Sequence, residues 1–389
     1  MSPIHTPYYC YYLYESTNGE KGRTVKFRCE REILADALTT AGRAASSRNT
    51  LPVLQGLRLD VTEGELVVTG TDLELTIQIS VPVFADRTGS AVVPAKLVAD
   101  IVRALPAGAV ELELHDDVLG ISAGRSEFTV TPKSVADFPA IVTSDAEPVT
   151  LSAKQVSSAL RQVVRAASTD DARAVLTGVQ LSATDGGVKL VATDSYRLAV
   201  RDLPQSSLLA AGQHVLVPSR ALAELQRILP DGESAELTVR FGAREAVFET
   251  DDTTLTTRLI EGDYPNVQNL LPSSHPNLLT VGREALAEAL RRVKILAQDT
   301  PVKLHLDTSG VLKLEATTQD VGKAGDEIDA TYEGTPMVVA FNPDYLASGL
   351  DAVEGDEVTL ATMDAMKPAV LRGVGHDDYL YLLMPVRVP

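Results

Sequence analysis

The stretch ATDSYRLAVRDL, residues 192–203, places five polar or ionisable side chains in a row. They are Thr193, Asp194, Ser195, Tyr196 and Arg197. Hydroxyls, a carboxylate and a guanidinium side by side could form a catalytic cluster, or they could fix the backbone of a bound peptide. Taken alone, Tyr196 and Arg197 are also ordinary strand residues. The choice between these readings depends on the rest of the chain.

The strongest enzyme-like motif is GISAG, residues 120–124, which fits the G-x-S-x-G pattern of a serine hydrolase with Ser122. In that fold the serine stands between a strand and a helix, whereas here strand-like VLGIS is followed by strand-like SEFTVT. We therefore predict a hairpin turn at this motif. The six histidines show no metal-ligand spacing, and the sequence has no Walker A or G-x-G-x-x-G loop. We expect no catalytic residue, metal or cofactor, and keep a Ser122 hydrolase as an alternative.

A hairpin pattern occurs three times in the chain. Segments that begin at Leu51, Arg173 and Thr300 each have an alternating apolar run, a glycine-containing turn and a second such run, followed by Thr or Asp. This order is typical of two antiparallel strands joined by a tight turn.

A second unit recurs with a constant period. The helix-like segments that follow Pro94, Pro218 and Asn342 are 124 residues apart in both steps. Pro, Ser and Asn at these places suit the start of a short helix. A period this long indicates a repeat of the size of a domain and not a solenoid.

Each third of the chain is therefore expected to run helix, strands, helix, strands. Strands outnumber helices, so the predicted class is α+β with antiparallel sheets in three similar domains. The expected helices lie near residues 30–45, 95–105, 153–167, 219–229, 283–297 and 343–352. We expect an N-terminal extension outside the fold at 1–24 and domains at 25–145, 146–273 and 274–389, divided at turn-like SDAEP and SSHPN.

The net charge of −18 argues, taken alone, against a nucleic-acid partner. The acidity is not uniform. The six helical regions, taken as 30–50, 94–105, 152–173, 218–229, 283–296 and 343–352, hold 15 Lys and Arg against 11 Asp and Glu, whereas the remaining 298 residues hold 20 against 42. The acidic excess therefore lies outside the helices.

Cations also recur at a fixed spacing on these helices. The pairs Lys96 and Arg103, Lys154 and Arg161, and Arg220 and Arg227 are each seven residues apart. Seven residues are close to two helical turns, so each pair shares one face. Leu97, Ile101 and Leu105 are expected on the apolar face of the second helix, and Leu222, Leu225 and Leu229 on that of the fourth. One such face is typical of a solvated helix, but its recurrence favours a shared cationic surface.

The number of cysteines and the length of the apolar runs indicate the cellular compartment of the protein. Cys10 and Cys29 are too few for a disulfide framework and lack a C-x-x-C spacing. No apolar run is long enough for a bilayer, and the Tyr-rich N-terminus is a poor signal peptide. The simplest expectation is a cytoplasmic protein without a membrane partner.

Several strings stand in an order that resembles one family. LPVLQGLRL with GTDLEL, then ATDSYRLAV, EGDYPNVQNLLP, FNPDYL and YLLMPVRV are similar to the bacterial DNA sliding clamp, the β subunit of DNA polymerase III, in an actinobacterial-like form. The likeness covers about residues 25–389 and leaves out the extension. It implies a homodimer closed head to tail, in which helices line a hole around double-stranded DNA and sheets form the outer wall. Such a ring contacts phosphates without reading bases.

The resemblance also implies partners and DNA-facing residues. A clamp is no enzyme. It tethers the DNA polymerase III α subunit, the clamp loader, other polymerases, and mismatch repair and ligase proteins through short peptides. The residues expected to face DNA are Arg43, Arg48, Lys96, Arg103, Lys154, Arg161, Arg165, Arg173, Arg220, Arg227, Arg291, Arg292 and Lys294.

The same resemblance implies that residues 192–203 form part of a pocket between the second and third domains, and that this pocket binds these peptides. Leu and Met would give an adaptable apolar floor, and Arg and Thr would fix the peptide backbone. The implied pocket residues are Leu176, Thr193, Ser195, Tyr196, Arg197, Leu198, Pro265, Asn269, Leu270, Asn342, Tyr345, Met366, Pro368, Leu382, Met384, Pro385, Val386 and Arg387.

For the dimer contact, the resemblance points to Phe128 and Val130 on an edge strand, against Ile295 and Leu296 of a second copy. Exposed apolar residues on a strand edge need a partner, although core packing is the alternative for these four. A second alternative concerns the whole chain, which as a diverged extra copy could be a scaffold that binds peptides without encircling DNA. Whether the chain is the main clamp of its cell or a second, inhibitor-resistant copy stays open at this point.

Overall fold

The computed structural model describes residues 24–45, 51–115, 117–142, 144–204, 208–267, 274–297 and 300–387. The predicted extension (except Thr24), Arg48, Asn269 and Leu270 lie outside these residues. The helices are α1 (Arg31–Gly42), α2 (Ala95–Ala104), α3 (Ala153–Val163), α4 (Ser219–Ile228), α5 (Arg283–Lys294) and α6 (Pro343–Ala352). Three 3-10 helices are η1 (Pro52–Gln55), η2 (Val164–Ala166) and η3 (Asp171–Thr177).

The strands repeat in three sets. The first set is β1 (Thr24–Glu30), β2 (Gly56–Val61), β3 (Glu65–Thr71), β4 (Leu75–Pro82), β5 (Phe84–Arg87), β6 (Gly89–Pro94), β7 (Ala109–His115), β8 (Val118–Ala123) and β9 (Ser126–Val130). The second is β10 (Val149–Ser152), β11 (Gly178–Thr184), β12 (Gly187–Thr193), β13 (Arg197–Pro204), β14 (His214–Pro218), β15 (Glu236–Phe241), β16 (Glu245–Glu249) and β17 (Thr253–Arg258). The third is β18 (Asn277–Gly282), β19 (Val302–Leu306), β20 (Val311–Thr318), β21 (Gly322–Glu333), β22 (Met337–Phe341), β23 (Glu357–Thr362), β24 (Ala369–Gly373) and β25 (His376–Leu383).

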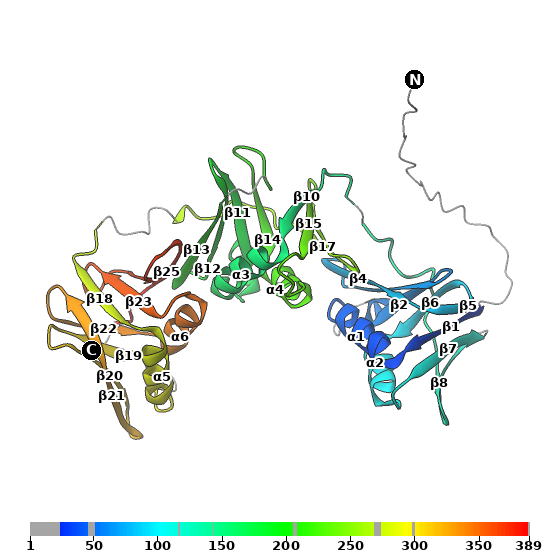
Figure 1. Ribbon diagram of the computed structural model, residues 1–389, viewed down its shortest axis with the longest axis horizontal. Coiled ribbons are helices and arrows are strands. Elements are labelled where there is room, and N and C mark those ends of the chain that lie inside the picture. The colour runs from blue at the N-terminus through cyan, green and yellow to red at the C-terminus, as the bar shows by residue number, and fades with distance from the viewer. Residues whose placement is uncertain are drawn as a thin grey trace.

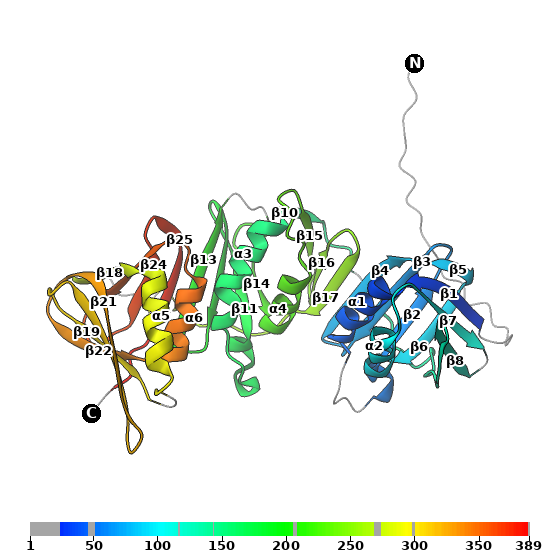
Figure 2. The same cartoon turned by 60° about the horizontal axis from the view of Figure 1, so that its bottom comes forward.

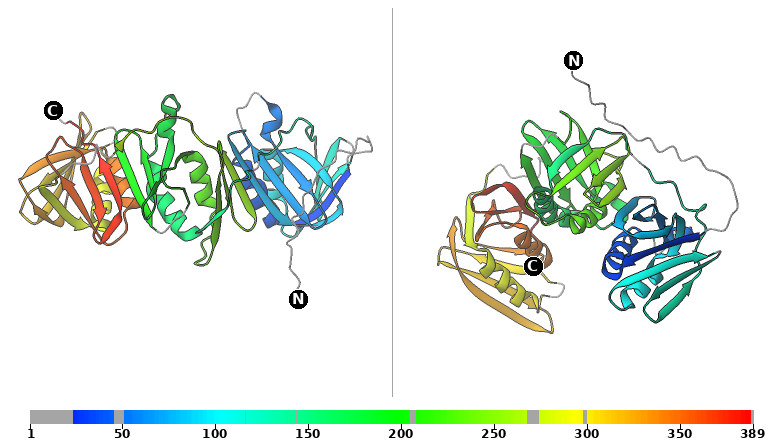
Figure 3. Two further views of the ribbon diagram at one scale, coloured as in Figure 1. Left: turned by 90° about the horizontal axis from the view of Figure 1, so that it is seen from above. Right: turned by 45° about the vertical axis from the view of Figure 1, so that its right-hand side comes forward.

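The chain forms an arc of three similar α+β domains. In each, a strand and a helix are followed by a run of strands, a second helix and three more strands. All six α-helices lie on the concave side of the arc and the sheets lie outside them (Figures 1 and 3). Figure 2 shows the two helices of each domain side by side on this inner face. The predicted fold class is confirmed.

Antiparallel sheets cross both boundaries between domains. One sheet has the order β10-β15-β16-β17-β4-β3-β2-β6, so that β17 of the second domain pairs with β4 of the first. In the twelve-stranded sheet, β13 of the second domain pairs with β25 of the third. Leu255 stands opposite Ile77 at the first junction, and Tyr381 opposite Ala199 at the second. Main-chain hydrogen bonds therefore join neighbouring domains as they join strands within one.

The helices begin where the sequence predicts but some end earlier. Asn342 caps α6 by accepting hydrogen bonds from the backbone N–H groups of Asp344 (2.8 Å) and Tyr345 (3.2 Å). The first helix of each domain ends three or four residues before the predicted limit. After α3 the chain continues as the 3-10 helix η2, a common way to tighten a last turn.

The predicted apolar face of α2 was wrong at Leu97, which is 50% exposed. Leu105 is buried as expected and Ile101 packs partly buried against the core, but Val98 and Val102 are the fully buried large side chains of the helix. Val98 and Val102 are four residues apart and share one face, which is the face that packs on the sheet. In α4 the predicted leucines are buried as expected: Leu222, Leu225 and Leu229.

The G-x-S-x-G motif lies in a β-hairpin, as predicted. Ser122 is inside β8, opposite Glu111 on one side and Glu127 on the other. Among the described residues, no helix is long and apolar enough to cross a membrane. In the same part of the chain, no three or more His, Cys, Asp or Glu side chains stand close enough together to hold a metal ion.

Gly70 on β3 is a point where helix and sheet backbones approach closely. A Cβ at this position would overlap the main-chain carbonyl of Ala41 at the end of α1. We expect Gly70→Ala to reduce the free energy of unfolding by about 1–3 kcal/mol, because the helix must shift to make room. Gly120→Ala on β8 is the matched control, since its Cβ would meet only Glu113 O at 3.6 Å. Equal midpoints of chemical denaturation for the two variants would contradict this account.

Candidate functional site

The turn between β12 and β13 is built by its own side chains. The Thr193 hydroxyl donates to the carbonyl of Arg197 (2.6 Å) and accepts from the N–H of Ser195 (3.1 Å). One carboxylate oxygen of Asp194 accepts from the N–H groups of Tyr196 (2.9 Å) and Arg197 (3.0 Å). Ser195 has φ 80°, a left-handed conformation that is uncommon for a residue with a side chain.

The first domain contains the same turn between β3 and β4. The Thr71 hydroxyl donates to the carbonyl of Leu75 (3.2 Å) and accepts from the N–H of Leu73 (3.1 Å). Asp72 accepts from the N–H groups of Glu74 (3.1 Å) and Leu75 (2.8 Å), and Leu73 has φ 79°. The Thr and Asp of both turns therefore serve as scaffold. The second turn is distinguished by the side chains that it presents.

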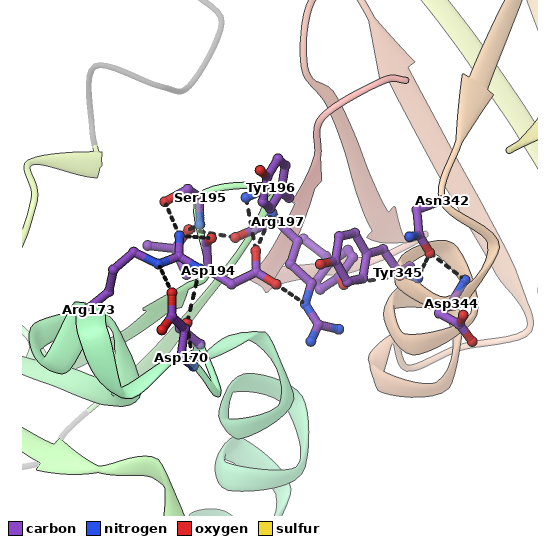
Figure 4. A network of polar contacts seen from close by, with 12 residues as sticks. Asp170, Arg173, Asp194, Ser195, Tyr196, Arg197, Asn342, Asp344 and Tyr345 are labelled. Carbon is purple, nitrogen blue, oxygen red and sulfur yellow. Dashed lines mark hydrogen bonds and ion pairs between the residues drawn. The ribbon is translucent and has the colours of Figure 1, made fainter. Parts of the chain in front are cut away.

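Tyr196 and Arg197 form a stack with Tyr345 of α6 in the third domain (Figure 4). The Arg197 guanidinium carbon lies 4.5 Å from the centroid of the Tyr345 ring, and the Tyr196 and Tyr345 rings are 6.5 Å apart and nearly parallel. Arg197 Nε also forms an ion pair with Asp194 Oδ2 at 3.0 Å. A guanidinium over an aromatic face gains electrostatic attraction to the ring. The stack therefore ties the turn to the neighbouring domain.

Burial and neighbouring groups shift the pKa of Arg197 and of the tyrosines around it. Desolvation opposes its charge, but Tyr381 and Asp194 more than offset this, so its pKa is raised above the ordinary value. Burial also raises the pKa of Tyr381, Tyr345 and Tyr264. These phenols stay neutral near pH 7, and the Tyr264 oxygen accepts a hydrogen bond from the backbone N–H of Thr193 (2.9 Å).

An apolar cluster lies on the strands behind this turn and spans the second junction. It joins residues of β12 and β13 to residues of β24 and β25. Its members are Val191, Leu198, Val200, Val267, Val370 and Leu382, with Tyr264 and Leu380 packed against them. Beside the cluster, Met384 (39% exposed) donates its N–H to the carbonyl of Tyr196 (2.9 Å). Exposed apolar side chains next to an apolar cluster are typical of a binding surface.

The structure brings most predicted pocket residues to this junction. Pro368 precedes Ala369, which pairs with Leu383, so Pro368 stands beside Met384. The side-chain carbonyl of Asn342 is engaged by its own helix as a cap. Leu176 is buried in η3. The exposed or partly exposed members among the described residues are Ser195, Tyr196, Arg197, Pro265, Asn342, Tyr345, Met366, Pro368, Met384, Pro385, Val386 and Arg387.

Asp194, Tyr264 and Tyr381 were missed by sequence reasoning. Asp194 could have been found from its spacing to Arg197, because Asp and Arg three residues apart across a turn can pair. Nothing in the sequence links Tyr264 to Thr193, from which it is 71 residues away.

Arg173 was placed wrongly among the cations of the concave face. Its guanidinium donates to the carbonyl of Asp194 (3.1 Å) and to the hydroxyls of Ser168 (3.3 Å) and Ser195 (3.5 Å), and pairs with Asp170 (Figure 4). Arg173 lies in η3, because the lining helix α3 has already ended at Val163. It therefore supports the turn of the candidate pocket.

The other predicted cations lie on or at the ends of the concave helices, and most are already paired with acids. Among the described residues of this set, only Lys96 and Arg291 form no ion pair. The pairs are Arg43–Glu224, Arg103–Asp100, Lys154–Glu233, Arg161–Glu354, Arg165–Asp351, Arg220–Asp72, Arg227–Glu224, Arg292–Asp326 and Lys294–Asp344.

Some of these pairs join neighbouring domains. Arg220 of α4 reaches Asp72 of the first domain at 2.5 Å. Arg165, after α3, reaches Asp351 of the third domain at 3.4 Å. Sequence reasoning missed this role, since the acids lie 148 and 186 residues from their partners.

The four residues predicted at the dimer contact differ in exposure. Phe128 on β9 is 42% exposed, and Ile295 after α5 is 77% exposed. Leu296 is half-buried. The prediction that Val130 is exposed was wrong: it is 6% exposed, because it pairs with Leu119 and packs into the core of the first domain.

The similarity of this chain to known proteins extends over all three domains of the arc. Family models of the DNA polymerase III beta subunit match residues 25–142 (N-terminal domain), 150–266 (central domain) and 268–387 (C-terminal domain). The chain belongs to this family.

Its similarity to other members extends over their full length. The beta sliding clamp of Streptomyces coelicolor is 35% identical over 377 residues, which cover 94% of this chain and 100% of that protein. The clamp of Staphylococcus aureus is 31% identical over 93% of this chain and 99% of its own length. A solved clamp from Bartonella birtlesii, bound to griselimycin, has a TM-score of 0.87 at 30% identity and covers 94% of this chain and 100% of its own. The clamp from Bacillus subtilis has a TM-score of 0.86 at 26% identity, with the same coverage.

Asp194 is the residue on which the site depends most. We expect Asp194→Ala to reduce the free energy of unfolding by about 3 kcal/mol, because it leaves the largely buried Arg197 without its counter-ion and two backbone N–H groups without an acceptor. Asp170→Ala is the control: Asp170 also accepts from a backbone N–H and pairs with an arginine, but is half exposed. Urea denaturation measures both, and a loss as large in the control would contradict the special role of Asp194.

Proposed function

We propose that the chain is a sliding clamp, in which two copies close into a ring around double-stranded DNA and hold DNA polymerase on it. The observation that carries the proposal is the arc itself, with every α-helix of the described residues on its concave side in a member of the beta subunit family. The clamp performs no catalysis. Ser122, the residue of the alternative hydrolase, lies within a strand and lacks the strand-to-helix turn that a nucleophile elbow requires.

Ring closure is supported by the two ends of the arc. The first domain ends in β9 with exposed Phe128, and the third presents exposed Ile295 at the end of α5, the helix that contacts the long strand β21. These are unlike surfaces, so their contact is head to tail, and two copies complete the ring. Twelve helices spaced about 10 Å apart would enclose a hole of about 28 Å, which admits a duplex with water around it.

The concave face suits weak, sequence-blind contact with DNA. Lys96 and Arg291 are free to contact phosphates, whereas the other described cations of the predicted set are each paired with an acid. Each phosphate contact releases counterions and adds affinity that salt screens. With few free cations, the ring would be kept on DNA by its closed shape more than by affinity, which allows it to slide.

The pocket at the second junction is proposed to take short peptides of partner proteins. Tyr196 and Arg197 offer an aromatic face and hydrogen-bond donors beside an apolar cluster, a combination that is enriched at binding hot spots. The partners that would dock here are the DNA polymerase III α subunit, the clamp loader, other polymerases, and mismatch repair and ligase proteins, all in the cytoplasm.

The first junction supplies an internal comparison. There the N–H of Arg258 donates to the carbonyl of Glu74 (2.9 Å), just as Met384 donates to Tyr196. The cleft of about 400 Å³ at this junction has a mixed lining, in which Leu73, Val142 and Leu259 stand among polar side chains such as Glu74 and Arg258. At the position of Tyr196 the first domain has the acid Glu74, so this junction lacks the aromatic side chain, which favours one peptide pocket for each chain.

Loss of the Tyr196 side chain should weaken peptide binding by about tenfold, because it removes an exposed aromatic anchor. The probe is a labelled clamp-binding peptide of the polymerase α subunit, and the readout is fluorescence anisotropy. Glu74→Ala is the matched control, since Glu74 is exposed at the counterpart position of the first junction. Equal binding by Tyr196→Ala and wild type would contradict the assignment.

A ring should be visible directly. Negative-stain electron microscopy at micromolar concentration is expected to show six-lobed closed rings with an open centre. Chain loaded onto circular DNA should be retained through gel filtration and lost after the circle is cut, because only a closed ring is held by topology. Compact particles without a hole, or retention that ignores cutting, would instead favour a scaffold that binds peptides without encircling DNA.

A further inference from the structure

The sulfur atoms of this chain are unevenly distributed. The chain has five methionines and two cysteines, and apart from Met1 every methionine lies in the third domain, from Met337 to Met384. Met366 and Met384 are 53% and 39% exposed, and both belong to the proposed pocket at the second junction. The most exposed thioethers among the described residues therefore lie where a partner peptide is proposed to bind.

The backbone holds Met384 at the rim of this pocket. Its N–H donates to the carbonyl of Tyr196 (2.9 Å), and two residues later the N–H of Val386 donates to the carbonyl of Ala340 (2.8 Å). Side chains alternate along the strand that leads to this point, so Met384 follows Leu382 on the face of the apolar cluster. The backbone cannot withdraw this thioether from the cluster without losing main-chain hydrogen bonds.

Met366 is held at the same rim by the turn between β23 and β24. One carboxylate oxygen of Asp364 accepts hydrogen bonds from the N–H groups of Met366 (2.7 Å) and Lys367 (2.9 Å). Pro368 of the same turn stands beside Met384, because the next residue pairs with the last residue of β25. The turn therefore brings a second exposed thioether to the pocket.

The other sulfur atoms with described surroundings are less open to an oxidant. Met337 packs against the hydrophobic core, and the Thr362 hydroxyl donates to its sulfur (3.9 Å). Cys29 is 4% exposed, and burial raises the pKa of its thiol to about 11. Such a thiol stays protonated near pH 7, and the protonated form is a poor nucleophile. An oxidant in water should therefore react first with the two exposed methionines.

The first junction has a charge where the second has this thioether. There the N–H of Arg258 donates to the carbonyl of Glu74, in the frame that Met384 completes at the second junction. The Arg258 side chain forms an ion pair with Glu74 (3.7 Å). The two junctions share the main-chain frame, so the thioether accompanies the apolar cluster of the pocket and not the frame.

We propose that Met384 and Met366 form an oxidation site at which hydrogen peroxide switches off peptide binding, an inference that rests on the proposed peptide pocket. The sulfur lone pair attacks one oxygen of hydrogen peroxide, so that an S–O bond forms and the O–O bond breaks. The other oxygen leaves as hydroxide and takes up the proton of the first, which gives water. Each thioether is oxidised to a sulfoxide and one peroxide is reduced to water.

A sulfoxide changes both the polarity and the shape of the pocket rim. The thioether is apolar and adapts to irregular surfaces, whereas the sulfoxide carries a polar oxygen. An apolar peptide side chain that covers this oxygen removes its water, and the side chains of Val191, Leu198 and Leu382 offer it no donor. A polar group buried without a hydrogen bond opposes binding. Oxidation should therefore release the partner peptide, and reduction of the sulfoxide should restore binding.

The test measures the affinity of the full-length chain for a labelled clamp-binding peptide by fluorescence anisotropy, before and after hydrogen peroxide. Dithiothreitol added after the peroxide reverses disulfides and sulfenic acids of Cys10 and Cys29 but leaves sulfoxides in place. We expect the dissociation constant to rise about tenfold or more, and methionine sulfoxide reductase to restore it. Mass spectrometry of proteolytic fragments should show oxidation at Met366 and Met384 before Met337.

Leucine variants assign the effect to these two residues. In the double variant Met366→Leu with Met384→Leu, whatever its starting affinity, peroxide should change the dissociation constant by less than about twofold, because leucine has no sulfur. Met337→Leu is the matched control and should lose affinity on oxidation as the wild type does. Saturating peptide present during the oxidation should slow the reaction at Met366 and Met384 without protecting Met337, because the bound peptide covers the rim.

The outcomes separate the oxidation site from the pocket itself. Complete oxidation of both methionines with unchanged affinity would overturn the switch, and so would loss of the folded circular dichroism spectrum on oxidation. A loss of affinity that persists in the double leucine variant would place the sensitive group elsewhere. Oxidation of Met337 as fast as that of Met384 would overturn the selectivity of the site. An untreated wild-type chain that does not bind the peptide would instead overturn the proposed pocket.

Discussion

The whole arrangement depends on strand edges that must find a partner. An edge strand exposes unpaired N–H and C=O groups, and a protein has to cover them, pair them or blunt them. Here β4 and β13 are paired by the strands of the next domain, so sheets run through both junctions and set the curve of the arc. The helices follow because each packs on the inner face of its sheet. A threefold repeat with only two of its junctions completed within the chain then calls for a second copy.

The helices and strands could be predicted from the sequence because the repeat shows each pattern three times. The constant spacing of Pro94, Pro218 and Asn342 located three helix starts that any single helix would leave ambiguous. The face of a helix was harder to predict. Apolar residues at positions 97, 101 and 105 suggested the apolar side of α2, but Leu97 is half exposed, and the helix also buries Val98 and Val102. Val130 shows the same limit on a strand, because burial is decided by the sheet that covers a side chain and not by its type.

At the site, the resemblance located the turn, and only the structure divides its residues into scaffold and binding surface. Thr193 and Asp194 make the same hydrogen bonds as Thr71 and Asp72 in the first domain. The two turns differ at Tyr196, because the counterpart of Tyr196 in the first domain is the acid Glu74. Contacts such as that of Tyr264 with Thr193 join residues far apart in the sequence, and local spacing carries no signal for them.

In the proposed clamp, the cations of the concave face would have two functions that oppose each other. Arg161, Arg165 and Arg220 hold neighbouring domains through acids, and each would have to weaken that contact to bind a phosphate. An exposed ion pair contributes only about 0–1 kcal/mol, so a passing phosphate can compete with it without opening the junction. Lys96 and Arg291 are free of this competition, and they lie on α2 and α5, in the two domains that carry the unpaired edges. In the proposed ring, attraction for DNA would therefore be strongest in the parts where the two copies meet.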